Sequence, residues 1–336
     1  MRRVLVPLDL PPALQLPMSG TVVRHLGGPT MGTTWSVKMV APPALACDSV
    51  RATIERVLSE ITVQMSTWIA DSEISNFNRA PPGTWHELFP EFHEVLCCAL
   101  NVAADTAGCY DPTIGALVDL WGFGPPGPRP TPPDDHAIAA ASALGGFRRL
   151  TFAPGRMILQ PGGLQLDLSS VAKGFAVDRV AETLGRLGIG DHLVEIGGEL
   201  RGSGIKPDGS PWWIDLEAPS TAGGDVETSR ETVVALHGLS VATSGDAWRY
   251  FEWNGRRWSH TIDPRNGRPV PEQLASVTVL HNSCMQADAR ATALTVLGPD
   301  AGFDYAQARG LAARFVVRGL RQIDERMTTA FAAMLK

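Results

Sequence analysis

Strand-like segments follow one another between long amphipathic helical segments, and this arrangement constrains the fold more than any other feature of the chain. Residues 33–40 alternate apolar Trp35, Val37 and Met39 with polar side chains, which is the period of a half-buried strand. Further strands are expected at residues 22–25, 192–196, 212–217, 232–236, 275–281 and 312–317. Because adjacent strands can pair antiparallel without a crossover helix, the pattern predicts an α+β or mixed α/β chain.

Four segments have the period of amphipathic helices. Residues 48–65 place Val50, Ile54 and Ile61 on one stripe, and Asp48 or Ser49 is expected to cap the start. The other three helices are expected at residues 90–107, 171–187 and 285–297, ended by Gly108, Gly188 and Gly298. Residues 125–133 contain six prolines, which exclude a regular helix or a central strand and predict a surface connection. That connection is either an insertion within one domain or a domain boundary.

Charge and hydropathy exclude two classes of partner. The 336 residues include 29 Lys and Arg against 35 Asp and Glu, so the net charge is −6, and no basic block offers a surface for nucleic acid. No apolar run approaches the ~20 residues that a transmembrane helix needs. Prolines and Asp9 interrupt the N-terminal segment, which predicts neither an export signal nor a lipid-anchoring cysteine and favours the cytoplasm. The five cysteines are odd in number and match neither a zinc site nor a disulfide framework.

The first segment with chemical potential runs from Leu166 to Asp178. A short apolar stretch ends in Asp167, Leu168 and two serines, and a helix is expected to begin there. A helix start offers unpaired N–H groups and a positive dipole end, both of which suit a phosphate, and Lys173 could add its charge one turn later. The alternative is structural: Asp167 or Ser169 caps the helix and Lys173 is solvated.

The second segment runs from Ser283 to Leu294. Asp288 and Thr292 are four residues apart, so they share one face of a helix whose neighbouring residues are mostly alanine. A carboxylate and a hydroxyl are hard oxygen donors of the kind that Mg²⁺ accepts together with phosphate oxygens and water. The structural alternative is a surface aspartate and a threonine that bonds back to its own helix.

The third segment surrounds His260. Residues 263–267 have the composition of a tight turn, and His260 lies on the strand that enters it. A histidine in this place could act as a general base near neutral pH, although most isolated histidines are only packed or exposed. Trp68 and Tyr110 could enclose a planar ring, and Gly197 with Gly198 permits a tight bend or a close ligand.

Taken together and in this order, these segments resemble the FAD:protein FMN transferase family, the ApbE-type flavin transferases. The matching segments extend over most of the chain and are Met31-Gly32-Thr33, residues 65–68 with 71–73, Tyr110-Asp111 with residues 120–124, residues 167–178, residues 194–199, Ala242 to Asp246, residues 259–264 and residues 287–294.

The resemblance implies a Mg²⁺-dependent enzyme that splits FAD at its pyrophosphate and attaches FMN, through a phosphoester, to a Ser or Thr of an acceptor flavoprotein. It implies a single compact α+β unit of T-fold-like mixed sheets packed with helices. The metal ligands that it implies are Ser170, through its carbonyl, with Asp288 and Thr292. The residues that it implies for FAD are Met31, Trp68, Cys109, Tyr110, Asp111, Asp167, Lys173 and Ile262.

We expect His260 to act as the base or positioning group for the acceptor hydroxyl. The chain departs from the family pattern at Trp68, where Tyr is common, and at Ser170, where Gly or Ala is usual. The domain is expected to span residues 21–320, with an N-terminal extension at 1–20 and a C-terminal tail at 321–336. Two other functions use the same residues: a Mg²⁺-dependent FAD pyrophosphatase, in which water replaces the acceptor, and a non-catalytic FAD-binding protein.

Overall fold

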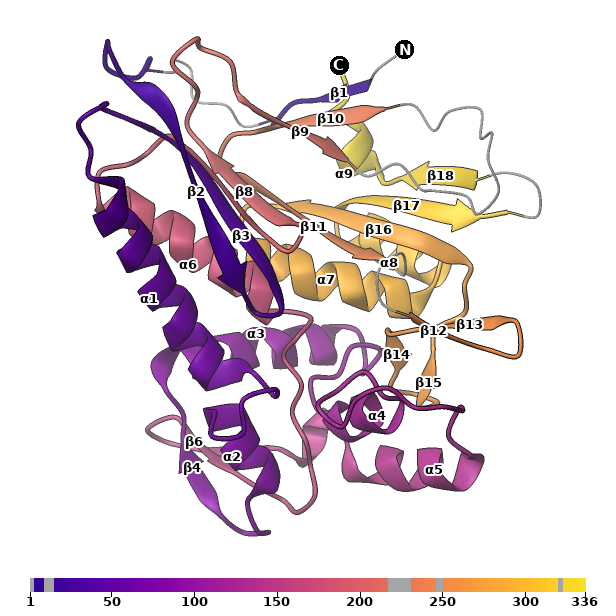
Figure 1. Ribbon diagram of the computed structural model, residues 1–336. Coiled ribbons are helices and arrows are strands. Elements are labelled where there is room, and N and C mark those ends of the chain that lie inside the picture. Colours follow the sequence, from indigo (N-terminus) through magenta and orange to yellow (C-terminus); the bar gives the residue numbers. More distant parts are fainter. Residues whose placement is uncertain (1–2, 9–14, 217–230, 246–249, 320–322) are drawn as a thin grey trace.

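A large antiparallel sheet divides the molecule into two layers of packing (Figure 1). The computed structural model describes residues 3–8, 15–216, 231–245, 250–319 and 323–336. Long helices cover one face of the sheet, and a smaller sheet with a short C-terminal helix covers the other. The expected α+β class is confirmed.

The large sheet has eight strands, and each neighbouring pair is antiparallel. In order across the sheet they are β18 (Ile323–Met327), β17 (Ala312–Arg318), β16 (Leu274–His281), β11 (Leu239–Gly245), β8 (Glu199–Ser203), β7 (His192–Ile196), β3 (Thr33–Ala41) and β2 (Val22–Thr30).

Four smaller sheets surround it. The first joins β1 (Arg3–Leu5), β10 (Thr232–Leu236) and β9 (Trp212–Leu216), and the second joins β4 (Trp85–Glu87), β6 (Met157–Leu159) and β5 (Thr151–Ala153). Two ribbons are formed by β12 (Tyr250–Trp253) with β13 (Arg256–Ser259) and by β14 (Ile262–Asp263) with β15 (Arg268–Pro269). Because β1 pairs with β10 and β18 pairs with β17, both ends of the chain take part in the sheets.

The described helices range from four to nineteen residues. They are α1 (Cys47–Met65), α2 (Glu73–Arg79), α3 (Pro90–Asp105), α4 (Gly115–Leu120), α5 (Asp135–Leu144), α6 (Ala172–Arg186), α7 (Cys284–Leu297), α8 (Ala301–Ala308) and α9 (Thr329–Ala332), with a 3-10 turn at Phe147–Arg149. Among the described residues, no helix combines the length and the apolar character that a membrane span requires.

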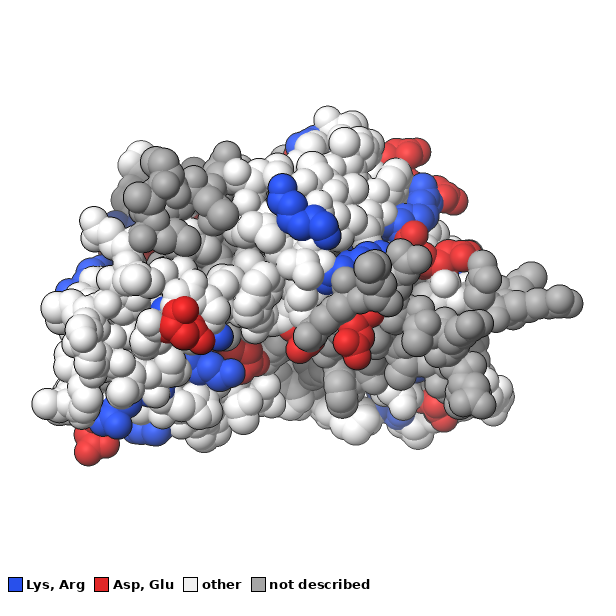
Figure 2. All heavy atoms as spheres, turned by 90° about the horizontal axis from the view of Figure 1, so that it is seen from above, with Lys and Arg blue, Asp and Glu red and all other residues white. Residues whose placement is uncertain are grey.

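Two apolar cores hold the layers together. Trp35, Val37 and Met39 point from β3 toward α1, α3 and α6, as the alternation of that strand predicts. Val40 faces the opposite side, where it packs with the small sheet of β1, β9 and β10 and with Phe331 of α9. On the face shown in Figure 2, basic and acidic side chains are interspersed instead of forming a patch of one sign.

Most of the long elements expected from the sequence are confirmed within one or two residues, and β7 and β10 match their expected bounds. One strand is longer than predicted: the sequence predicts it at residues 22–25, and β2 continues to Thr30. The expected cap of α1 is wrong: Ala46 precedes the helix, and no side chain caps it. The proline-rich residues 125–133 form a connection between α4 and α5, as expected.

Helices α6 and α7 approach each other closely at Gly174. A Cβ placed on Gly174 would lie 2.4 Å from the carbonyl oxygen of Cys284, so no larger residue fits between the two backbones. Asp178 fixes the same junction, because its carboxylate accepts the N–H groups of Cys284 and Met285 at 3.0 Å each, at the start of α7. Arg201 of β8 donates to the same carboxylate at 2.5 Å.

We expect Gly174→Ala to destabilise the protein by about 1–3 kcal/mol, because the added methyl group forces α6 and α7 apart. Gly185→Ala is the matched control, since a Cβ at Gly185 of the same helix meets no atom within 4 Å. That substitution should leave stability unchanged or raise it by up to about 1 kcal/mol through helix propensity. Urea unfolding followed by circular dichroism measures both, and equal stabilities for the two variants would contradict the close approach.

Candidate active site

The chain turns sharply before α6, and this turn presents backbone groups to the α6–α7 junction. Asp167 accepts the N–H of Ser169 at 2.9 Å and its hydroxyl at 2.5 Å, which closes a local turn. The structural alternative, in which Asp167 or Ser169 caps the helix, is wrong, because Val171 is the residue before the helix and no side chain caps it. The N–H groups at the start of α6 therefore need acceptors from other parts of the chain.

Asp288 of α7 supplies one of those acceptors. Its Oδ2 accepts the N–H of Gly174 at 3.0 Å, and the carboxylate is buried. Gly174 is the third residue of α6, so its N–H has no acceptor within the helix and bonds to Asp288 instead. Within the part of the chain that the structure describes, no donor reaches the Ser170 carbonyl. The junction thus combines a buried carboxylate with a carbonyl oxygen that has no internal partner.

Thr292 extends this group of oxygens by one helical turn. It lies four residues after Asp288 on α7, so the two side chains share a face, and its hydroxyl has no hydrogen-bond partner among the described residues. Thr295 of the same helix behaves differently, because its hydroxyl bonds back to the Ala291 carbonyl at 2.9 Å. The structural alternative of a back-bonded threonine therefore applies to Thr295 and not to Thr292.

Lys173 lies next to this group and is paired with Glu199, for which the sequence predicts no role. Its Nζ is 2.6 Å from Oε2 of Glu199, whose side chain is only 3% exposed at the start of β8. The Lys173 side chain is 30% exposed, so the alternative of a solvated lysine is wrong. The sequence distinguishes Glu199 by its position directly after Gly197 and Gly198. That position alone does not predict which side chain Glu199 contacts.

Burial governs the protonation of these groups. Desolvation raises the pKa of Asp288, and the Lys173 charge and the Gly174 N–H act against that rise. Desolvation, and then the charge of Asp288, raise the pKa of Glu199 to about 8, while Lys173 opposes the rise. Desolvation lowers the pKa of Lys173, but the charges of Asp288 and Glu199 outweigh it and the pKa is raised overall. The two carboxyl groups therefore favour the charged form of Lys173.

Tyr110 connects the turn to the inner wall of the site. Its phenol oxygen lies 2.9 Å from Oγ of Ser170, and its ring is buried. Burial raises the pKa of Tyr110, so the phenol stays protonated at any physiological pH. Ser170 therefore has its side chain engaged by Tyr110, while its carbonyl remains available at the junction.

The other residues predicted to contact FAD lie in different settings. Trp68 follows α1 and is 60% exposed, whereas Met31 is half-buried against the main core in the turn between β2 and β3. Both residues of that turn, Met31 and Gly32, have positive φ (46° and 72°), which is the geometry of a tight hairpin. Cys109 and Ile262 are buried in two smaller apolar clusters.

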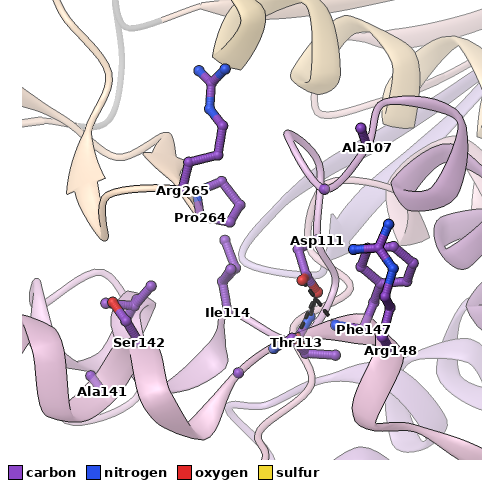
Figure 3. A pocket seen from close by; sticks show the side chains of 14 residues that line it. Ala107, Asp111, Thr113, Ile114, Ala141, Ser142, Phe147, Arg148, Pro264 and Arg265 are labelled. Atoms are coloured by element: carbon purple, nitrogen blue, oxygen red, sulfur yellow. Dashed lines mark hydrogen bonds between the residues drawn. The ribbon is translucent and has the colours of Figure 1, made fainter.

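Asp111 lines a hollow of about 260 Å³ (Figure 3). Its carboxylate accepts the N–H and hydroxyl of Thr113, at 2.8 and 2.6 Å, and the N–H of Phe147 at 3.0 Å. Pro264 and Arg265, from the turn between β14 and β15, close the hollow on the other side. Ser170, Asp288 and Thr292 do not line it, so the hollow does not contain the α6–α7 group.

His260 follows β13 directly and lies in an aromatic surrounding. Its ring meets that of Phe123 edge to face, with 6.3 Å between centroids, and Phe123 in turn lies 6.0 Å from Phe251. A second hollow, of about 420 Å³, is lined by Trp258, two residues before His260. His260 thus stands beside an aromatic ribbon, and its role as a base stays a prediction.

The oxygen atoms at the junction suit Mg²⁺ better than a softer metal. No group of three or more His, Cys, Asp and Glu side chains that could hold a metal occurs among residues 3–8, 15–216, 231–245, 250–319 and 323–336. What the junction offers is one carboxylate, one free hydroxyl and one free carbonyl, and Mg²⁺ accepts a small number of such ligands and completes its shell with water and phosphate oxygens. The residues present therefore fit a hard divalent cation.

Three comparisons identify related proteins. The model of the ApbE family matches residues 31–315. The FAD:protein FMN transferase of Vibrio cholerae is 38% identical over 312 residues, which cover 93% of this chain and 92% of the relative, and that of Haemophilus influenzae is 39% identical over 308 residues, which cover 89% and 87%. The crystal structure of the Pseudomonas stutzeri flavinyl transferase ApbE, in its apo form, superposes with a TM-score of 0.85 at 40% identity and covers 94% of this chain and 97% of that one.

The raised pKa of Glu199 predicts how the metal-free protein responds to pH. The folded protein holds a proton on Glu199 up to about pH 8, whereas the unfolded chain loses it near 4.5, so stability falls as the pH rises from 4.5 to 8. Between pH 6 and pH 9 the free energy of unfolding should fall by less in Glu199→Gln than in the unaltered protein, with a difference on the order of 2 kcal/mol. Urea denaturation at several pH values measures it, and an unchanged slope would show that Glu199 does not titrate in this range.

Proposed function

The chain belongs to the ApbE family, and from that membership and the geometry of the α6–α7 junction we propose that it is an FAD:protein FMN transferase. It cleaves the pyrophosphate of FAD, attaches FMN through a phosphoester to a Ser or Thr of an acceptor flavoprotein, and releases AMP. The observation that carries the proposal is the buried carboxylate of Asp288 beside a free carbonyl, a free hydroxyl and a lysine ammonium. That combination suits a diphosphate and its counterion.

A divalent cation, for which Mg²⁺ is the best match, would be held by the Ser170 carbonyl and the side chains of Asp288 and Thr292. When bound, it supplies positive charge to the two phosphates that the reaction separates. The buried Asp288 is suited to this role because its carboxylate has one internal donor, the Gly174 N–H, and keeps its remaining lone pairs free.

FAD would extend from the junction toward the rim of the site. Lys173 lies at the first turn of α6, where its ammonium can approach a phosphate oxygen without leaving its ion pair. Trp68, exposed after α1, offers an aromatic face for the flavin ring, and Met31 lies in the hairpin turn between β2 and β3. Tyr110 and Asp167 shape the turn that carries Ser170.

The transfer replaces the phosphoanhydride bond of the pyrophosphate with a phosphoester bond to the acceptor. The acceptor oxygen forms a bond to the phosphorus of the FMN half while the bond from that phosphorus to the bridging oxygen breaks, and the bridging oxygen leaves with the electron pair as part of AMP. His260 takes the proton of the acceptor hydroxyl. Because little covalent chemistry falls to the protein, its main tasks are to align the two oxygens and to balance charge.

The most direct experiment combines the purified protein with FAD, Mg²⁺ and a candidate acceptor domain. Mass spectrometry of the acceptor should reveal the added mass of FMN on a Ser or Thr, and the flavin should survive denaturation. Rapid AMP release without any acceptor would instead identify an FAD pyrophosphatase. Stable FAD-loaded protein that never yields AMP with Mg²⁺ would identify a binding protein.

Removing the carboxylate tests the proposed metal site. Asp288→Ala should abolish Mg²⁺-dependent AMP release, and Thr292→Val should reduce Mg²⁺ affinity by about tenfold because one oxygen ligand is lost. Thr295→Val is the matched control, since its hydroxyl bonds to its own helix. Mg²⁺ titrations of AMP release compare the variants. Unchanged release by Asp288→Ala, or equal effects at Thr292 and Thr295, would refute the ligand assignment.

Replacing His260 tests the step that involves the acceptor hydroxyl separately from FAD binding. His260→Ala should slow flavin transfer by about 10²- to 10⁴-fold, because the acceptor hydroxyl loses its base, while FAD binding is retained. Transfer rates come from in-gel flavin fluorescence of the acceptor, and FAD binding comes from fluorescence quenching. Transfer at the full rate would exclude His260 as the base.

A further inference from the structure

We propose that Glu199 is a positioning residue: it holds the Lys173 ammonium away from Asp288 and so keeps that carboxylate open to a divalent cation. The inference rests on the proposed function, since it assigns Asp288 to the cation. It gives a role to the Glu-Ile-Gly-Gly-Glu segment at residues 195–199, which the proposed reaction does not otherwise use.

The ammonium of Lys173 has two negative neighbours on different elements. Glu199, at the start of β8, lies 2.6 Å from Nζ, and Asp288, on α7, accepts the N–H of the very next residue, Gly174. Both carboxyl groups raise the pKa of the lysine, and Cys284 on α7 contributes in the same direction. Of the two carboxylates, Glu199 is the one within ion-pair distance, so the lysine pairs with a residue of β8 and not with one of α7.

The hairpin between β7 and β8 fixes this choice. Gly197 and Gly198 have φ of +58° and +100°, which only glycine adopts without strain, and a Cβ at Gly197 would lie 3.5 Å from Cδ of Lys173 and 2.9 Å from Cγ2 of Thr33. The turn therefore lies against the lysine stem. It places Glu199, the residue that follows, within reach of the ammonium.

Glu195, the other carboxylate of the segment, serves the turn and not the lysine. It accepts the N–H of Gly198 at 3.0 Å and the hydroxyl of Ser36 at 3.1 Å. It belongs to the same hairpin as Glu199 and carries the same charge, so it is a matched control for any effect of the hairpin itself.

The charges predict what happens when Glu199 is lost. Where Glu199 is ionised, above its pKa of about 8, Lys173 and Glu199 together carry no net charge, so Asp288 keeps its own negative charge for a cation. Glu199→Gln leaves the ammonium with Asp288 as its remaining carboxylate neighbour, and the lysine then competes directly with a bound metal. Removing the lysine as well takes that competitor away and restores a net charge of zero for the pair.

The test measures Mg²⁺ binding without FAD, from the rise in unfolding temperature as Mg²⁺ is added. It is made at pH 9, about one unit above the pKa of Glu199, so that this carboxyl group is mostly ionised. Glu199→Gln should weaken Mg²⁺ binding about tenfold, the lower end of the effect of a residue that orients a metal ligand. The double variant Glu199→Gln with Lys173→Met should bind within about threefold of the unaltered protein, as should Glu195→Gln, since both keep Asp288 free of the ammonium.

Two results would overturn the inference: unchanged Mg²⁺ affinity in Glu199→Gln, or a double variant that binds as weakly as Glu199→Gln alone. If Glu199→Gln does not fold, Lys173→Met decides, because it must bind Mg²⁺ at least as tightly as the unaltered protein. A weaker affinity in that variant rejects the competition. Failure of the unaltered protein to respond to Mg²⁺ would instead refute the proposed metal site, so the two failures are distinguishable.

Discussion

The hydrogen bond from the Gly174 N–H to the Asp288 carboxylate is the interaction on which the site depends. It gives an N–H at the start of α6 an acceptor on α7, and it brings the Asp288 carboxylate to the turn that carries the Ser170 carbonyl, which no described donor reaches. This contact is possible because Gly174 has no side chain and the α7 backbone comes within 2.4 Å of where a Cβ would be. Because Gly174 has no side chain, oxygen donors from the start of α6 and from α7 can lie close together.

The rest of the fold serves to hold the two helices in that relation. Asp178 accepts two N–H groups at the start of α7 and also binds Arg201 of the sheet. The hairpin of β7 and β8 places Glu199 next to Lys173. The long helices pack on one face of the eight-stranded sheet, and the small sheet with α9 shields the other. Glu199 is buried and paired with Lys173, which is the condition under which buried charges are tolerated, whereas the buried Asp288 carboxylate accepts the Gly174 N–H.

The sequence predicts the long elements well because their periods are strong, and it fails where tertiary contacts decide. The stripe from Val50 to Ile61 identifies α1, whereas the six-residue helix α4 is too short to be stable without its neighbours. Asp288 and Thr292 could be placed on one helical face from their spacing, but the free carbonyl of Ser170 and the partner of Lys173 depend on how α6, α7 and β8 meet. Asp246, which belongs to a segment of the family resemblance, lies outside the described residues.

The central claim is that one divalent cation binds at the α6–α7 junction. Anomalous diffraction from crystals soaked with Mn²⁺ in place of Mg²⁺ tests it most directly. The account predicts a single strong peak within bonding distance of the Ser170 carbonyl, the Asp288 carboxylate and the Thr292 hydroxyl. A junction without a peak, or a peak held by other residues, would contradict it.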